Sequence, residues 1–157
     1  MTRFAVDTML GTLAKWLRAL GYDAAFLAHA PDDELLSLSA RESRVVLTRD
    51  AELARRAGKF GLLVAPKDLD DQLLLVVGTY PGRDSSPLSR CLVCNALLDG
   101  IARDEAVAIG SVPPGAAARA SEFWMCPDCR KIFWDGTHYK AMRRKIHMLF
   151  PDLPLNP

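Results

Sequence analysis

The chain contains 157 residues, half of them hydrophobic and a quarter charged, with 20 basic and 19 acidic side chains. This length and composition fit one domain, or a small domain with an appendage, and they exclude a wholly disordered chain. The formal net charge of +1 excludes a protein that coats nucleic acid by bulk charge, but it is compatible with a local basic face. No apolar run reaches the roughly 18 residues of a membrane span. Because Met1 does not open a signal-peptide layout either, we expect a cytoplasmic protein.

Residues 1–80 alternate short apolar runs with segments of helical periodicity. We expect strands at 3–7, 22–28, 44–48 and 61–65, and helices at 10–20, 31–42, 51–57 and 69–77. Strands that alternate with helices of about ten residues form βαβ units around a mostly parallel sheet. Because the expected strands are apolar on both faces, helices must cover both faces of that sheet. The sequence therefore predicts an α/β fold.

The composition changes beyond residue 80, where Pro, Gly and Ser become frequent. We expect a first domain at 1–80, a linker at 81–89, a second domain at 90–150 and a tail at 151–157. The second domain is expected to end in a basic helix at 137–149.

Two C-x2-C pairs organise the second domain. The cysteines are Cys91 with Cys94 and Cys126 with Cys129, and each pair places two thiolates on one tight turn. Four such thiolates form the tetrahedral site that structural Zn²⁺ prefers. The aromatic, β-prone residues around the second pair fit the short hairpins of a zinc ribbon. An iron site of the rubredoxin type uses the same ligands and stays open as the alternative.

Acidic side chains follow the expected strands at one edge of the sheet. Asp7 follows the first strand, Asp50 follows the third, and the run Asp32-Asp33-Glu34 opens the helix after the second. Ligands of parallel α/β sheets bind beyond the carboxyl ends of the strands, and Glu52 lies close to that edge. Clustered carboxylates repel one another unless a cation neutralises them, and hard oxygen ligands favour Mg²⁺ or Mn²⁺. Such an ion can activate water against a phosphodiester. The alternative for each acid is a helix cap or an exposed charge.

Basic residues offer two candidate contacts for a polyanion. Lys15 and Arg18 lie in the first helix and would steady a phosphate, with a solvated helix face as the alternative. Residues 130–147 carry six Lys or Arg against one acid, whereas residues 1–84 carry 11 basic and 12 acidic side chains. Aromatic residues lie among these bases, and the combination suits single-stranded nucleic acid. The expected nucleic-acid contacts are Lys140, Arg143, Arg144 and Lys145.

Several motifs occur in a fixed order along the chain. They are Asp7-x-Met9-Leu10-Gly11-x-Leu13-Ala14-x-Trp16-Leu17-Arg18, Asp32-Asp33-Glu34-Leu35, Leu47-Thr48-Arg49-Asp50, Arg90-Cys91-x-x-Cys94-Asn95 and Trp134-x-Gly136-x-His138. In combination they resemble the Mut7-C ribonuclease family over about residues 3–150. The resemblance implies a PIN-like nuclease fold followed by a zinc ribbon, and metal-dependent cleavage of RNA by clustered acids.

The resemblance also implies roles for individual residues. Asp7, Asp33 and Asp50 match the acidic positions expected to hold metal, with Asp32 as the alternative to Asp33 and Glu52 or Asp135 as candidates for a fourth acid. We therefore expect a Mg²⁺- or Mn²⁺-dependent endoribonuclease with a structural Zn²⁺, acting on tRNA or another structured RNA. A non-catalytic RNA- or protein-binding adaptor and a small-molecule phosphatase are the alternatives. The number of catalytic ions and the oligomeric state stay open.

Overall fold

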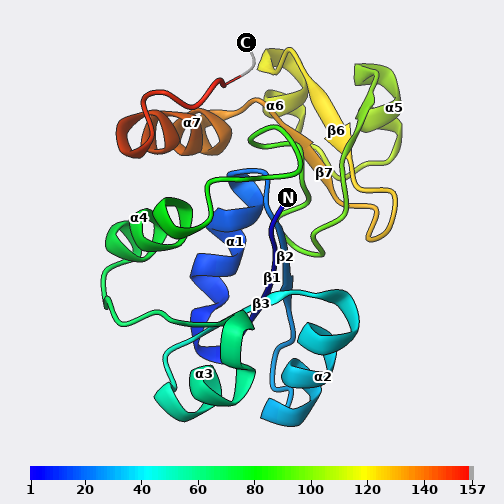
Figure 1. The fold of residues 1–157 in the computed structure, drawn as a ribbon. Coiled ribbons are helices and arrows are strands. Elements are labelled where there is room, and N and C mark those ends of the chain that lie inside the picture. The colour runs from blue at the N-terminus through cyan, green and yellow to red at the C-terminus, as the bar shows by residue number, and fades with distance from the viewer. Residues whose placement is uncertain (156–157) are drawn as a thin grey trace.

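The structure is a computed structural model that describes residues 1–155 of the chain. Figure 1 shows a larger sheet flanked by helices and a smaller sheet beside one end of it. The strands of the first sheet are Arg3–Val6 (β1), Asp23–Phe26 (β2), Val45–Thr48 (β3) and Gly61–Leu63 (β4). Its helices are Gly11–Ala19 (α1), Asp32–Glu42 (α2), Ala51–Ala57 (α3) and Leu69–Thr79 (α4), with 3₁₀ turns at Thr8–Leu10 (η1) and Gly58–Phe60 (η2).

The first sheet is parallel throughout, in the order β2-β1-β3-β4, which confirms the predicted α/β class. Successive residues of a strand point to opposite faces. Phe4 and Val6 of β1 therefore pack in one core with residues of α1 and α4. Ala5, which lies between them, packs in a second core with residues of α2 and α3. Helices cover both faces, as apolar strands of this kind require.

Helix α1 stops where the sequence predicts, just before Gly21. This glycine takes a φ of +91°, a left-handed conformation that only glycine adopts at little cost. A Cβ atom there would lie 2.2 Å from the carbonyl oxygen of Ser85. The predicted linker, 81–89, makes this close approach, and the amide of its Leu88 donates to the carbonyl of Ala19 over 2.7 Å. The segment is thus fixed against the end of α1.

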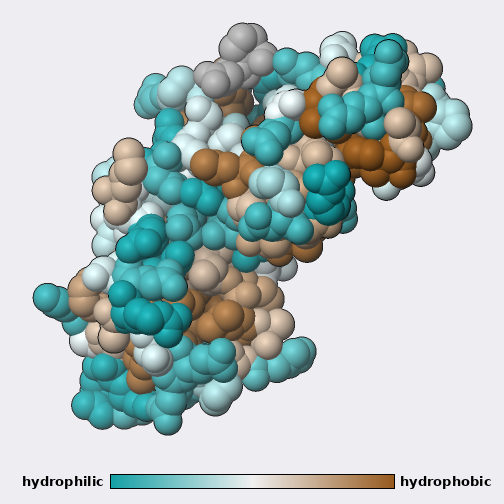
Figure 2. All heavy atoms as spheres, turned by 90° about the vertical axis from the view of Figure 1, so that its right-hand side faces the viewer, coloured by the Kyte–Doolittle hydropathy of each residue, from teal (hydrophilic) through white to brown (hydrophobic). Residues whose placement is uncertain are grey.

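The second sheet is antiparallel and consists of Asp99–Ile101 (β5), Phe123–Met125 (β6) and Ile132–Trp134 (β7). Two short helices, Arg103–Ala108 (α5) and Pro114–Arg119 (α6), connect β5 to β6 and share a small core with β6 and β7. The strand β5 and the helices α5 and α6 were not predicted from the sequence, because such short segments show no clear periodicity. The small core leaves Val107 and Ile109 exposed. Figure 2 shows a hydrophobic patch in the upper part of the molecule, the part that contains the second sheet and its two short helices.

The basic helix forms where it was predicted, at Thr137–Leu149 (α7). Its buried residues Met142 and Ile146 belong to the core that covers β1 and α1, so by packing this helix joins the first sheet. The domain boundaries at 80, 89 and 150 stay a prediction. Of the predicted tail, residues 156–157 lie outside the described chain. Within residues 1–155, no helix is long and apolar enough to cross a membrane.

Candidate functional site

One threonine joins two of the predicted acids at the carboxyl edge of the first sheet. The hydroxyl of Thr48, the last residue of β3, donates to Oδ2 of Asp7 over 2.7 Å and accepts from the amide of Asp50 over 3.0 Å. Asp7 directly follows β1, and its own amide donates to the carbonyl of Leu47 over 3.0 Å. The pairing of β1 with β3 therefore brings the two acidic positions together around a threonine that is fully buried.

Each of the two acids is also bound to the start of a helix. Asp7 accepts from the amide of Thr8 over 2.7 Å, and it caps η1. Asp50 caps α3, because its Oδ1 accepts from the amides of Glu52 (2.7 Å) and Leu53 (3.1 Å). Free amides at a helix start favour a negative charge. Both side chains are consequently held as oriented carboxylates, with Asp7 half-buried and Asp50 exposed.

The other predicted acids at this edge are paired with arginines of α3. Asp33 binds Arg56 through Oδ1, and Oδ2 of Asp32 lies 3.6 Å from the same guanidinium. Glu52 pairs with Arg55 over 2.6 Å. The arginine side chains thus balance the charge of these acids without a metal ion. Within residues 1–155, Asp7, Asp33 and Asp50 do not form a group of ligand atoms lying within 4.8 Å of one another.

Oxygen donors at this edge still suit a hard cation. Carboxylates are preferred ligands of Mg²⁺ and Mn²⁺, and Thr48 and the helix caps already orient two of them. To reach the same ion, Asp33 would have to exchange its contact with Arg56. Asp135, the other candidate for a fourth acid, lies in the second sheet region, where its Oδ1 accepts from the amide of Ser121 over 2.8 Å.

The four predicted cysteines form one cluster. Their sulfur atoms all lie within 4.8 Å of one another, with Cys91 and Cys129 3.6 Å apart and Cys94 and Cys126 3.2 Å apart. Four sulfurs at about 2.3 Å from a tetrahedral Zn²⁺ lie roughly 3.8 Å from each other, so the donor set and its dimensions fit this ion.

The two cysteine turns repeat the same backbone geometry. The residue after each second cysteine, Asn95 in the first turn and Arg130 in the second, has a positive φ, of 78° and 63°. Its amide donates over 3.0 Å to the carbonyl of the first cysteine in both turns. A tight turn of this kind points both thiolates of a pair to one side, which explains why the spacing alone predicted the cluster.

The thiols of the cluster have unlike proton affinities. Burial raises the pKa of Cys91 to about 12. For Cys126, burial acts in the same direction, but hydrogen bonds from the amides of Cys129 and Asp128 and from the Cys94 thiol outweigh it and lower the pKa to about 7. A metal ion that binds all four as thiolates must therefore displace a proton from Cys91.

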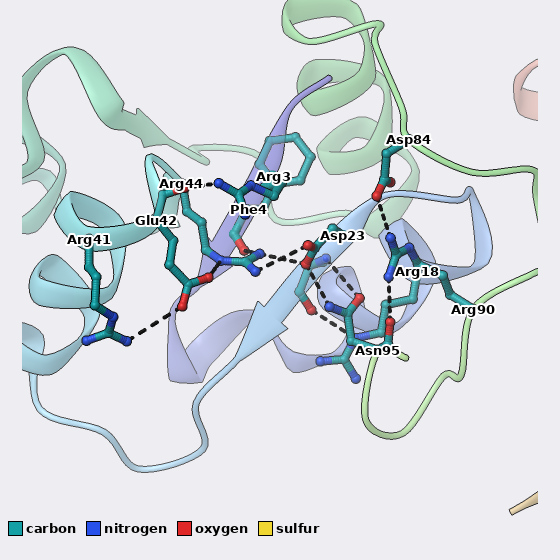
Figure 3. A network of polar contacts seen from close by, with 11 residues as sticks. Arg3, Phe4, Arg18, Asp23, Arg41, Glu42, Arg44, Asp84, Arg90 and Asn95 are labelled. Atoms are coloured by element: carbon teal, nitrogen blue, oxygen red, sulfur yellow. Dashed lines mark hydrogen bonds and ion pairs between the residues drawn. The ribbon is translucent and has the colours of Figure 1, made fainter. Parts of the chain in front are cut away.

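A polar network attaches the first cysteine turn to the edge strand β2 (Figure 3). The side-chain oxygen of Asn95 accepts from the amide of Ala24 over 3.0 Å, and its amide nitrogen donates to Asp23 over 2.7 Å. Arg18 is buried beneath this turn and donates to the carbonyls of Leu92 (3.0 Å) and Val93 (2.9 Å). The guanidinium expected to steady a phosphate instead binds backbone carbonyls of the cysteine turn.

The remaining predicted cations differ in how much the fold engages them. Lys145 lies 2.5 Å from Asp70 of α4, and its ammonium group stands 5.5 Å from the ring centre of Trp16. This lysine therefore ties α7 to the first sheet. Lys15, Lys140 and Arg144 are exposed, and Arg143 is half-buried.

Comparison with known proteins yields one match. The family model described as the Mut7-C RNAse domain matches residues 2–146, which include the acidic edge, the cysteine cluster and most of α7. No curated protein and no solved structure matches the chain. The match indicates a ribonuclease-type function, with RNA as the substrate.

Proposed function

The chain belongs to the Mut7-C RNase domain family, and from this premise we propose that it is a metal-dependent endoribonuclease of the PIN-like type. We assign the catalytic role to Asp7, Asp33 and Asp50, at the carboxyl edge of the parallel sheet. The observation that carries this assignment is the contact of Thr48 with both Asp7 and Asp50. One buried hydroxyl binds the carboxylate of Asp7 and the backbone amide of Asp50, which keeps the two acidic positions side by side.

The hydrogen bonds at Thr48 define the direction of its proton. Because Oγ1 accepts from the amide of Asp50, its single proton points to Asp7. This hydrogen bond fixes the orientation of the Asp7 carboxylate. Asp50 is held in the same way by the amides at the start of α3.

Asp7, Asp50 and Asp33 would hold Mg²⁺ or Mn²⁺, which when bound activates water and stabilises the leaving oxygen of a phosphodiester. Arg56 balances the charge of Asp32 and Asp33, and Asp33 would exchange this contact to serve as a ligand of the ion. Lys15, exposed on α1, is a candidate contact for the substrate phosphate, and Asp32 and Glu52 support the acidic edge. The cysteine cluster holds a structural Zn²⁺ that has no open ligand position.

Basic residues on α7 that are exposed or half-buried are the proposed contacts to the RNA backbone. Lys140, Arg143 and Arg144 extend the positive surface of this helix, whereas Lys145 is engaged by Asp70. Contacts of this kind act through phosphate charge and weaken as salt rises. They fit tRNA or another structured RNA and do not by themselves select a sequence.

Metal titration with RNA tests the catalytic assignment. Asp7→Asn and Asp50→Asn should each lower kcat by roughly 100-fold or more, because each removes a charged oxygen ligand. The assay measures cleavage of single-stranded RNA and tRNA against Mg²⁺ and Mn²⁺ concentration. Asp104→Asn, at an exposed position on α5, is the matched control and should cleave like the wild type. Circular dichroism and melting temperature report whether each variant folds.

A non-catalytic RNA-binding adaptor is the second candidate, favoured by the pairing of Asp33 with Arg56 in place of a convergent acidic cluster. It predicts salt-sensitive RNA binding with no turnover at any metal concentration. Wild-type cleavage that survives the Asp7→Asn, Asp50→Asn double substitution would show instead that the acids have been misassigned.

A further inference from the structure

A pocket of about 480 Å³ lies where the two sheets meet. Lys15 of α1 lines one side, and the first cysteine turn with the residues around it lines another. Most of the rest comes from β6, β7 and the first half of α7. Four aromatic side chains contribute to its wall: Trp124, Phe133, Trp134 and Tyr139. We call this space the aromatic pocket. Its volume falls within the roughly 300–1,000 Å³ typical of small-ligand sites.

The aromatic residues of the pocket are held in place but incompletely buried. The rings of Trp124 and Tyr139 stack with centres 5.3 Å apart and planes inclined by 19°. Trp124 also lies directly opposite Phe133 in the pairing of β6 with β7. In the described chain, none of these three belongs to a hydrophobic core, and all are half-buried. Core formation therefore does not account for their presence.

The charge of the pocket favours an anionic ligand. Among residues 1–155, its lining contains no Asp or Glu; Arg90 in the lining is buried and paired with Asp84, whereas Lys15 and Lys131 are exposed cations, and His138 lies beside them. A flat aromatic surface beside cationic side chains is the combination that binds nucleic-acid strands, because bases stack on the rings while phosphates meet the cations. A paired base offers no free face for such stacking, which restricts the ligand to an unpaired one.

We infer that the aromatic pocket binds an unpaired base of the same RNA strand that is cut at the acidic edge, an inference that rests on the proposed ribonuclease function. Helix α1 links the two places, since Asp7 precedes it and Lys15 lies within it. The 3₁₀ turn η1, at about 2 Å per residue, and the first turn of α1, at about 1.5 Å per residue, separate Asp7 from Lys15 by on the order of 12 Å along the chain, which a few nucleotides span. The substrate is therefore single-stranded RNA, or an unpaired segment of a structured RNA, cut a few nucleotides from the base that the pocket holds.

Binding measured without cleavage tests the pocket. The zinc-loaded 157-residue chain carrying Asp7→Asn is titrated with a fluorescently labelled single-stranded RNA oligonucleotide, and anisotropy gives Kd. Adding Phe133→Ala should weaken binding about 5-fold or more, as expected for the loss of one stacking contact. Phe60→Ala, a half-buried phenylalanine beside β4, is the matched control and should leave Kd unchanged. Tyr139→Leu, which removes the stacked ring but keeps apolar volume, is a second variant in case Phe133→Ala lowers the melting temperature.

The RNA itself provides the second arm of the experiment. An abasic site moved along the oligonucleotide should weaken binding to the Asp7→Asn chain at one register and have no effect there once Phe133→Ala is added. Equal binding by Phe133→Ala, Tyr139→Leu and the control overturns the inference, as does a duplex RNA or a free uridine monophosphate that binds as tightly as the single strand. If binding depends on Phe133 but the wild type never cleaves, the proposed function fails and the pocket stands. If the wild type cleaves and Phe133→Ala binds and cleaves equally, the pocket fails and the nuclease stands.

Discussion

At the scale of single residues, the acidic edge depends on a side chain that carries no charge. Thr48 is fully buried, and its hydroxyl contacts Asp7 and Asp50, which lie more than forty positions apart in the chain. The carboxylates are chemically conspicuous in the sequence, but this hydroxyl orients the carboxylate of Asp7 and binds the backbone amide of Asp50. Outer-shell groups of this kind tune the metal affinity and activity of the ligands they orient.

Thr48→Val tests that role, because valine keeps the shape of threonine and removes the hydroxyl. We expect activity to fall about 10- to 100-fold. The free energy of unfolding should fall by roughly 1–3 kcal/mol, since the backbone amide of Asp50 loses its hydrogen-bond partner. Thr48→Ser keeps the hydroxyl and should retain most of the activity. Cleavage rates at saturating Mg²⁺ and urea unfolding measure the two effects. A Thr48→Val enzyme as active as the wild type would remove Thr48 from the site.

At the scale of elements, the first cysteine turn is attached to β2 by charged and polar groups. Asp23, at the start of that strand, accepts from Arg44 over 2.6 Å and from Asn95 over 2.7 Å. Burial disfavours the charged form of Asp23, but the hydrogen bonds from Arg44 and Asn95 outweigh it, so the pKa of Asp23 lies below its ordinary value. The folded state thus stabilises the carboxylate, and folding favours its ionisation.

The depressed pKa of Asp23 has a predictable consequence for stability. Its contribution is fully present above the ordinary carboxyl pKa of about 4 and is lost as pH falls through the lower folded-state value. Asp23→Asn should therefore lower the unfolding free energy at pH 7 by about 1–3 kcal/mol, and the difference from wild type should shrink in acid. Urea unfolding over a pH series measures it, and subtracting the two proteins cancels any metal loss they share. A difference that stays constant down to acid pH would contradict the assignment.

At the scale of the whole molecule, the two proposed centres lie at opposite ends of the first sheet. The cysteine turn binds the first residues of β2, Asp23 and Ala24, whereas Asp7 and Asp50 lie at or just beyond the carboxyl ends of β1 and β3. Strands of four residues separate these ends by roughly 10–13 Å. A metal ion held by the cysteines would thus be close enough to shape the aromatic pocket without contacting the acids.

Zinc removal should separate the two centres. After the zinc is removed with a chelator and Mg²⁺ alone is returned, binding of single-stranded RNA should weaken about 5-fold or more. The melting temperature should also fall, because the two cysteine turns lose the ion that joins them. Cleavage of oligonucleotides too short to reach the aromatic pocket should change much less. Metal analysis before treatment should find about one zinc per chain, and returning Zn²⁺ should restore binding. A zinc-free chain with wild-type affinity and melting temperature would contradict this division of roles.

Features that depend on the pattern of neighbouring residues could be predicted from the amino-acid sequence alone. The alternation of apolar runs and helical periods predicted the parallel sheet, the C-x2-C spacing predicted the cysteine cluster, and the position of Asp7 and Asp50 after strands predicted one shared edge. Each of these predictions rests on a residue spacing that is typical of a strand, a helix or a tight turn, and a few neighbouring residues are enough to show that spacing.

Contacts between residues that are distant in the sequence could be identified only from the folded structure. In the folded chain Arg18 binds the cysteine turn, and α7 packs against the core of the first sheet. Asp33 pairs with Arg56, and the aromatic pocket is lined by segments as distant in the sequence as Lys15 and Tyr139. None of these partners is a sequence neighbour, so no local period specifies them. Packing and charge neutralisation select them only once the elements have come together.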